Sequence, residues 1–115
     1  MRRFLVLVAM TAMAAPTTFN GSLGHFTNTG TGVARNLQFV ASRHTVTFIP
    51  ASSPSACSAR IEGSIDGTNY FDLSGPQTCT SPVMFHISDK PITSVRAFVI
   101  TLTGGSVDAQ YQGVQ

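Results

Sequence analysis

The chain has 115 residues, of which 43% are hydrophobic and only 10% are charged, a balance that predicts one packed core and excludes a disordered chain. Two of its seven basic residues, Arg2 and Arg3, stand at the N-terminus, and the other five are scattered along the chain with five acidic residues. This distribution lacks the basic patch with interleaved aromatic residues that marks a nucleic-acid partner, so no nucleic-acid partner is predicted.

The first segment of the chain, residues 1–16, has the pattern of a secretory signal peptide. A short basic head precedes an apolar run from Phe4 to Met13, and Ala12-Met13-Ala14 reads as a small-x-small cleavage site. The alternative is a retained N-terminal arm that packs on a neighbouring molecule through its apolar side chains: Phe4, Leu5, Val6, Leu7 and Val8. The run is shorter than the roughly 20 residues that a membrane span needs, so no span is predicted. Residues 17–115 are predicted to form the folded domain.

Alternating apolar and polar residues predict β-strands through the first half of this domain. The first two are expected at 34–40 and 44–49, and in the second Val46 and Phe48 share one face. After a turn rich in Ser and Pro, residues 57–65 alternate again. That alternation places four side chains inward: Cys57, Ala59, Ile61 and Ile65.

A hairpin follows this strand. Asp66-Gly67 favours a tight turn because both residue types tolerate positive φ, and residues 70–73 return from the turn as the next strand. The carboxylate of Asp66 can accept backbone N–H bonds there, which favours a role in the turn over a role in catalysis. The motif consists of Ser64, Asp66, Gly67, Asn69 and Tyr70.

The longest predicted strand lies in the second half of the domain, at 92–102, after a shorter one at 83–87 that places Val83, Phe85 and Ile87 on one face. The longest strand has Val95, Ala97 and Val99 on one face, and its other face is also apolar near the C-terminal end. Such a strand is either central in its sheet or turned toward a partner. The candidate interface residues on this outer face are Phe98, Ile100 and Leu102.

A last strand is expected at 107–114, after the Gly104-Gly105 turn. The chain thus shows roughly seven or eight short strands separated by frequent turn signals, the spacing typical of sandwiches. The sequence therefore predicts an all-β fold, a single antiparallel β-sandwich or jelly roll.

The two cysteines, Cys57 and Cys79, fit no metal-binding spacing. In an exported chain they are candidates for one disulfide, whereas in a reducing compartment they would be two separate small side chains.

Catalytic chemistry is not predicted. The histidines His25, His44 and His86 and the acidic residues are dispersed, and no spacing implies a nucleophile with its base, paired carboxylates or a metal site. We therefore expect no enzyme activity, no metal and no cofactor.

Two stretches carry a more specific pattern than any of these. The first is the hairpin motif, and the second runs from Pro91 through Val95-Arg96 and a long strand to Thr103-Gly104-Gly105. Together they resemble small β-sandwich structural proteins of tailed bacteriophages. This resemblance implies a virion protein that decorates or cements a capsid or sits on the tail, and that contacts other virion proteins or copies of itself in a symmetric assembly.

The same hairpin also resembles, more weakly, discoidin-like jelly rolls. That likeness implies the alternative function, a secreted, extracellular module that binds a carbohydrate or a surface. Its loops would then hold a glycan, with Asn69 or Tyr70 as contacts.

Overall fold

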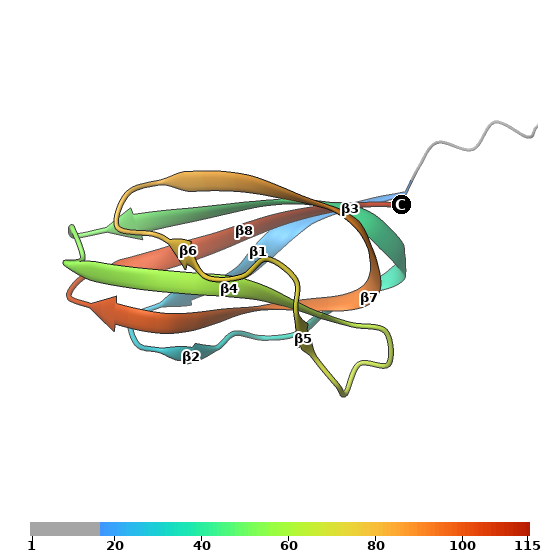
Figure 1. Ribbon diagram of the computed structural model, residues 1–115, viewed down its shortest axis with the longest axis horizontal. Helices are drawn as coiled ribbons and strands as arrows, with labels where there is room; N and C mark the ends of the chain where they lie inside the picture. The colour runs from blue at the N-terminus through green and yellow to red at the C-terminus, as the bar shows by residue number, and fades with distance from the viewer. Residues whose placement is uncertain (1–16) are drawn as a thin grey trace, which may run out of the picture.

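Antiparallel strands make up most of the part of the chain that the computed structural model describes, residues 17–115 (Figure 1). They are β1 (Thr18–Phe26), β2 (Gly30–Thr31), β3 (Arg35–Ala51), β4 (Ala56–Ser64), β5 (Phe71–Asp72), β6 (Gln77–Thr78), β7 (Val83–Thr103) and β8 (Ser106–Val114). The predicted all-β antiparallel fold is confirmed. Over these residues the structure holds no helix that could span a membrane. The predicted cleavage site and the candidate arm at 4–8 lie outside the described residues.

The strands form two layers around one core. Their hydrogen-bonded order is β1-β8-β3-β7-β4-β5, while β2 pairs with β7 and β6 pairs with β4. The first layer contains β1, β8, residues 43–51 of β3 and residues 83–88 of β7. The second layer contains residues 94–103 of β7 together with β2, β4, β5 and β6. Because β7 turns from one layer into the other, it joins the two sheets at one end of the sandwich (Figure 1).

The two strands β3 and β7 are longer than predicted. The segments expected at 34–40 and 44–49 form one strand of 17 residues, and those expected at 83–87 and 92–102 form one of 21 residues. Each bends where a non-glycine residue takes a positive φ, 65° at Gln38 and 61° at Asp89. Such irregularities bend a strand without ending its pairing. The polar and proline residues that predicted the end of a strand therefore mark a bend within one.

A buried hydrogen-bond chain fixes the corner of β7. The Nε2–H of His44 donates to the carbonyl of Lys90 at 2.8 Å, and Nδ1 accepts from the hydroxyl of Tyr111 at 2.6 Å. Burial lowers the pKa of His44, which its hydrogen bond to Lys90 partly opposes, and burial raises the pKa of Tyr111. Both groups are therefore neutral at ordinary pH, and the chain links β3, β8 and the corner of β7.

The core follows the predicted alternation. Val46 and Phe48 of β3 are buried in the first layer, and Val95, Ala97 and Val99 of β7 are buried in the second. Complete burial of a side chain as large as Phe48 contributes roughly 1.5–3 kcal/mol.

The alternation fails at Ile65, which was predicted inward. Strand β4 ends at Ser64, and Ile65 is 76% exposed because it lies beyond the last paired residue, where the core has ended.

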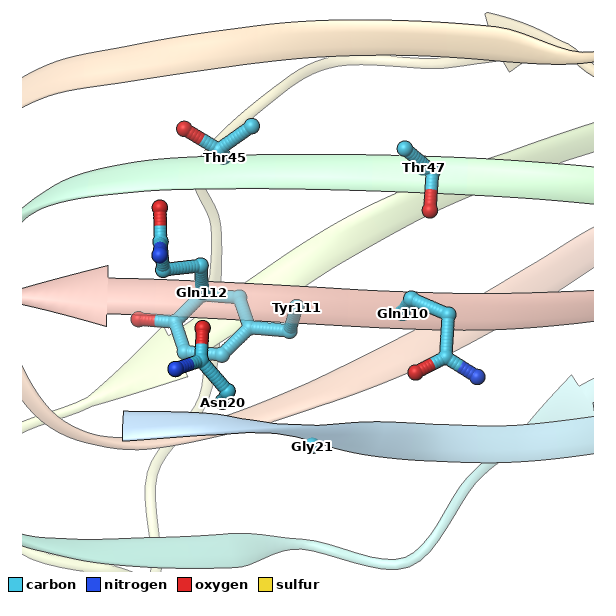
Figure 2. Close-up of a pocket in the computed structure, with 7 residues that line it drawn as sticks. All are labelled: Asn20, Gly21, Thr45, Thr47, Gln110, Tyr111 and Gln112. Carbon is cyan, nitrogen blue, oxygen red and sulfur yellow. The ribbon is translucent and has the colours of Figure 1, made fainter. Parts of the chain in front are cut away.

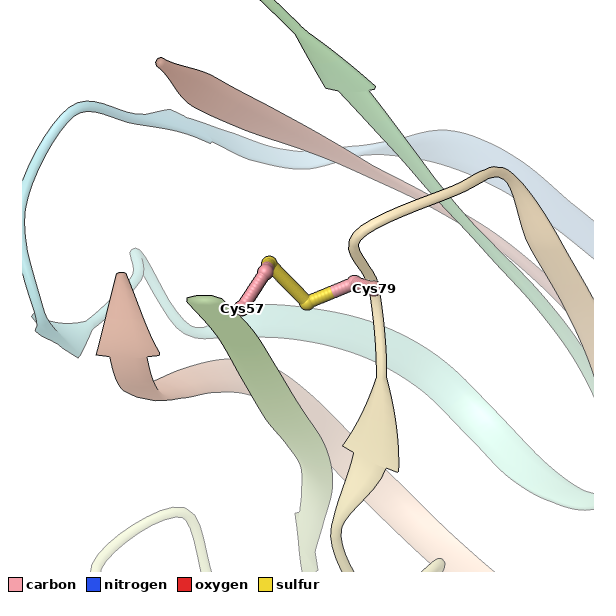
Figure 3. The surroundings of a disulfide bond; sticks show 2 residues. All are labelled: Cys57 and Cys79. Atoms are coloured by element: carbon pink, nitrogen blue, oxygen red, sulfur yellow. A yellow bond between two sulfur atoms is a disulfide. The ribbon is translucent and has the colours of Figure 1, made fainter. Parts of the chain in front are cut away.

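The second layer is closed by a disulfide between Cys57 on β4 and Cys79, which follows β6 (Figure 3). Both residues are buried, and the N–H of Cys79 donates to the carbonyl of Cys57 at 2.9 Å. Leu102 of β7 pairs with Cys57 and packs against the core. It therefore does not lie on the outer face where the alternation placed it, because the pairing of β4 with β7 shifts by one residue between Ser58 and Ala59.

Candidate interaction surface

The hairpin motif forms a loop between β4 and β5 that extends away from the sandwich (Figure 1). The hydroxyl of Ser64, at the end of β4, donates to Oδ1 of Asp66 at 2.8 Å and accepts the N–H of Gly67 at 2.9 Å. Gly67 has a φ of 78°, a conformation that a side chain would strain.

Asp66 is the centre of this loop. Its Oδ1 accepts the backbone N–H groups of Thr68 and Asn69, each at 2.8 Å, and its Oδ2 accepts the side-chain amide of Asn69 at 2.7 Å. The backbone N–H groups of Asn69 and Thr68, followed by the side chains of Asn69 and Ser64, hold the pKa of Asp66 well below its ordinary value. The loop is therefore built around an ionised carboxylate whose oxygens are already occupied.

Tyr70 joins the loop to the outer face of β7. Its hydroxyl donates to Oγ of Ser94 at 2.6 Å, and Ser94 donates to the carbonyl of Arg35 at 3.2 Å. The guanidinium of Arg96 lies over the Tyr70 ring, 4.1 Å from its centroid, in a cation–π contact.

The contact between Arg96 and Tyr70 is one end of a row of side chains on the outer face of β4 and β7, which we call the arginine ladder: Phe98, Arg60, Glu62, Arg96 and Tyr70. Arg60 lies 4.9 Å from the centroid of the Phe98 ring and donates Nε and Nη2 to Oε2 of Glu62 at 3.0 and 2.6 Å. Arg96 donates Nε to Oε1 of Glu62 at 2.8 Å. Each carboxylate oxygen of Glu62 is thus bound by a different arginine.

The ladder is held by one buried charge. The Glu62 side chain is 6% exposed, whereas those of Arg60 and Arg96 are 32% and 30% exposed. Burial by itself would raise the pKa of Glu62, but hydrogen bonds and charge attraction from Arg96 and Arg60 outweigh it and leave the pKa below its ordinary value. With two cations and one anion, the ladder carries a net positive charge.

The predicted interface residues on β7 lie differently from one another. Phe98 is half-buried beneath Arg60, Ile100 is half-buried, and Leu102 points into the core. The ladder therefore has Phe98 at one end and Tyr70 of the hairpin motif at the other.

The most exposed large apolar side chains flank the loop, and sequence reasoning missed them as a site. Within residues 17–115, Ile65 is 76% exposed and Phe71 is 69% exposed. Both lie in segments predicted as strands, and the turn signal at Asp66-Gly67 does not say at which residue the pairing on either side of it ends. The ladder was missed because the register of β4 against β7 decides which charges meet.

The histidines do not converge. His44 is buried, His25 lies 2.5 Å from the Asp108 carboxylate, and His86 contacts the Thr45 hydroxyl at 3.0 Å. Among the described residues, no group of three or more His, Cys, Asp or Glu side chains could hold a metal ion.

Comparison with known proteins identifies the fold. No family model matches the chain, and no curated protein matches its sequence. The crystal structure of the SPBc2 prophage-derived protein YomS is similar, with a TM-score of 0.70 and 11% identity, over 92% of this chain and 100% of that one. The PBSX exported protein XepA has a TM-score of 0.63 and 12% identity over 99% of this chain, which spans 47% of that one. The predicted likeness to small phage-encoded β proteins is confirmed at the level of the fold.

Proposed function

We propose that this chain is a non-enzymatic virion structural protein, a capsid decoration or cement protein or a tail accessory protein. It would act by contact with other virion proteins or with copies of itself in a symmetric assembly, and the virion would be its location. The fold shared with two prophage proteins supports this proposal. XepA is an exported protein, which is consistent with a place outside the cytoplasm for this chain.

The observation that carries the proposal is the β4–β5 loop. It presents Ile65 and Phe71 to solvent on a segment that the Asp66 hydrogen bonds hold in one conformation. A preorganised loop loses little conformational entropy on binding, and exposed aromatic anchors are typical of the residues that dominate protein interfaces. The arginine ladder next to this loop adds positive charge that favours an acidic partner surface.

The particle itself provides the test. Phage particles from cells that carry the gene would be purified on a density gradient and probed with an antibody against this chain. We expect the wild-type chain in the particle fraction and strong depletion of a double variant, Ile65→Ser with Phe71→Ser. Val33→Ser is the matched control, because Val33 is 68% exposed but lies between β2 and β3.

Absence of the wild-type chain from the particles would overturn the virion proposal. Equal incorporation of the double variant and the wild type would leave the chain in the virion but reject this loop as the contact.

A further inference from the structure

The outer face of the first layer carries a shallow groove that the arginine ladder does not reach. Its volume is about 300 Å³, and its polar lining comes from three neighbouring strands. Figure 2 shows the side chains concerned: Asn20 on β1, Gln110 and Gln112 on β8, and Thr45 and Thr47 on β3.

The register of the three strands creates this arrangement. Asn20 pairs with Gln112, which pairs with Thr45, so these three side chains form one row across the sheet. Gln110 and Thr47 are paired in the next row. On β3 and β8 the neighbours of these residues along the strand are buried, and Asn20 pairs with Gln112, so all five side chains stand on the same outer face.

The side chains in this groove remain available for hydrogen bonding. Within residues 17–115, no side-chain hydrogen bond to another residue is formed by Asn20, Gln110, Gln112 or Thr47. The Thr45 hydroxyl forms one, to His86 at 3.0 Å. Each amide offers two N–H donors and one carbonyl acceptor, and each threonine hydroxyl both donates and accepts. No ionised side chain lines the groove.

An apolar hollow of about 240 Å³ adjoins the polar groove, and Thr47 lines both. Its other walls include Ile49 and Met84, both exposed, and Met84 pairs with Thr47 across the strands. The face therefore changes from uncharged hydrogen-bonding groups to apolar groups along one continuous surface.

We propose that this face binds a neutral oligosaccharide. Sugar hydroxyls would exchange hydrogen bonds with the amides and threonine hydroxyls, while the C–H surface of a neighbouring sugar unit would pack on Met84 and Ile49. The choice follows from charge and polarity. The groove itself is lined by no cation that would hold an anionic ligand, and Arg43, which lines the hollow adjoining it at Thr45, donates to the carbonyl of Gln115. An apolar protein surface would bury the three amides without partners, which is unfavourable. The groove lies apart from Asn69 and Tyr70, whose side-chain amide and hydroxyl are hydrogen-bonded within the protein.

The test measures binding of the oxidised full chain to neutral hexose and N-acetylhexosamine oligomers on an array, and then by calorimetry. Uronic acid and sialylated oligomers serve as the charged comparison. We expect saturable binding of at least one neutral oligomer, with affinity unchanged between low and high salt, since no ion pair forms. NMR shifts on titration should cluster on β1, β8 and β3.

Variants locate the site. Gln110→Ala combined with Gln112→Ala should weaken binding about tenfold or more, and Met84→Ser should weaken it independently. Asn28→Ala, in the exposed stretch between β1 and β2, is the matched control and should bind like the wild type. Thermal unfolding of each variant separates lost binding from lost folding.

Four outcomes would overturn the inference. They are the absence of saturable binding to every neutral oligomer, equal binding by the double glutamine variant and the wild type, binding confined to charged oligomers, and a dimer in sedimentation that the double variant dissolves. The last would assign the face to a second copy of the chain. None of these results bears on incorporation into particles, which tests a different surface.

Discussion

The two outer faces of the sandwich differ in whether their polar side chains are bonded to other residues of the protein. On the second layer, the charges of Arg60, Glu62 and Arg96 are bound to one another, and aromatic rings cover both guanidinium groups. On the first layer, the amides of Gln110 and Gln112 face solvent without a partner among residues 17–115.

This difference predicts that substitutions on the two faces change the free energy of unfolding by different amounts. The internally paired face holds β4 against β7 and positions the loop, so changes there should alter the free energy of unfolding. The side chains of Gln110 and Gln112 form no hydrogen bond with another residue within 17–115, so changes there should alter the free energy of unfolding little. Four substitutions test this difference between the faces, in decreasing order of the predicted loss in the free energy of unfolding.

Removal of the disulfide should have the largest effect and should act on the second layer. Cys57→Ala with Cys79→Ala opens a loop that spans a sequence separation of 22 residues. Chain-entropy reasoning predicts a loss of about 3 kcal/mol in the free energy of unfolding. Denaturant titration measures this global loss. Amides that exchange by local opening should accelerate more in β4 and β6 than in β1 and β8, because the disulfide joins β4 to the residue that follows β6. Equal acceleration of local opening in both layers would contradict the expected difference between the faces.

Glu62→Gln should have the next largest effect. The amide cannot neutralise two neighbouring guanidinium groups, so the variant should lose about 2 kcal/mol, less than a fully buried pair because both arginines are partly exposed. Asp108→Asn on the first layer is the matched control. Its contact with His25 is exposed, so a change within about 0.5 kcal/mol is expected in the same denaturant titration. Similar losses in the free energy of unfolding in both variants would contradict the expected difference between the two faces.

The pH dependence of stability sharpens the Glu62 result. Because the folded-state pKa of Glu62 lies below its ordinary value of 4.5, the ion pairs contribute fully above about pH 4.5. That contribution is lost as the pH falls through the lowered pKa. The difference in unfolding free energy between the wild type and Glu62→Gln should therefore be constant at neutral pH and shrink in acid. If the difference in unfolding free energy grew in acid, the lowered pKa of Glu62 would be contradicted.

Tyr70→Phe should have a smaller effect. It removes the hydroxyl that binds Ser94 but keeps the ring beneath Arg96, so a loss of about 1 kcal/mol is expected by thermal or chemical unfolding. The double variant with Ser94→Ala tests whether the two groups act together. Strict additivity of the two single losses would show that their hydrogen bond contributes nothing.

Gln110→Ala should have the smallest effect. The side chain is exposed and unpaired within the described residues, so the free energy of unfolding should stay within about 0.5 kcal/mol of the wild type. A larger loss in the same unfolding assay would mean that the first face is also structural.

The alternation of residue types was enough to predict the strand content and much of the core. Val46, Phe48, Val95, Ala97 and Val99 were placed correctly because burial on one face of a strand follows the period of two. Ile65 and Leu102 were misplaced, since that period holds only while a strand stays paired and in register. A one-residue shift in pairing leaves no mark in the local sequence, and the Asp66-Gly67 turn signal does not fix the last paired residue before it.

By itself, therefore, the sequence determined the fold class, the strand-rich domain and the hairpin motif, because short-range alternation and turn chemistry act between near neighbours. Contacts between distant segments establish the rest: four short segments are two bent strands, Glu62 lies between two arginines, and the amides of β1 and β8 meet the threonines of β3. Those relations join residues far apart in the chain, and strand register, which depends on packing across the whole sandwich, sets them.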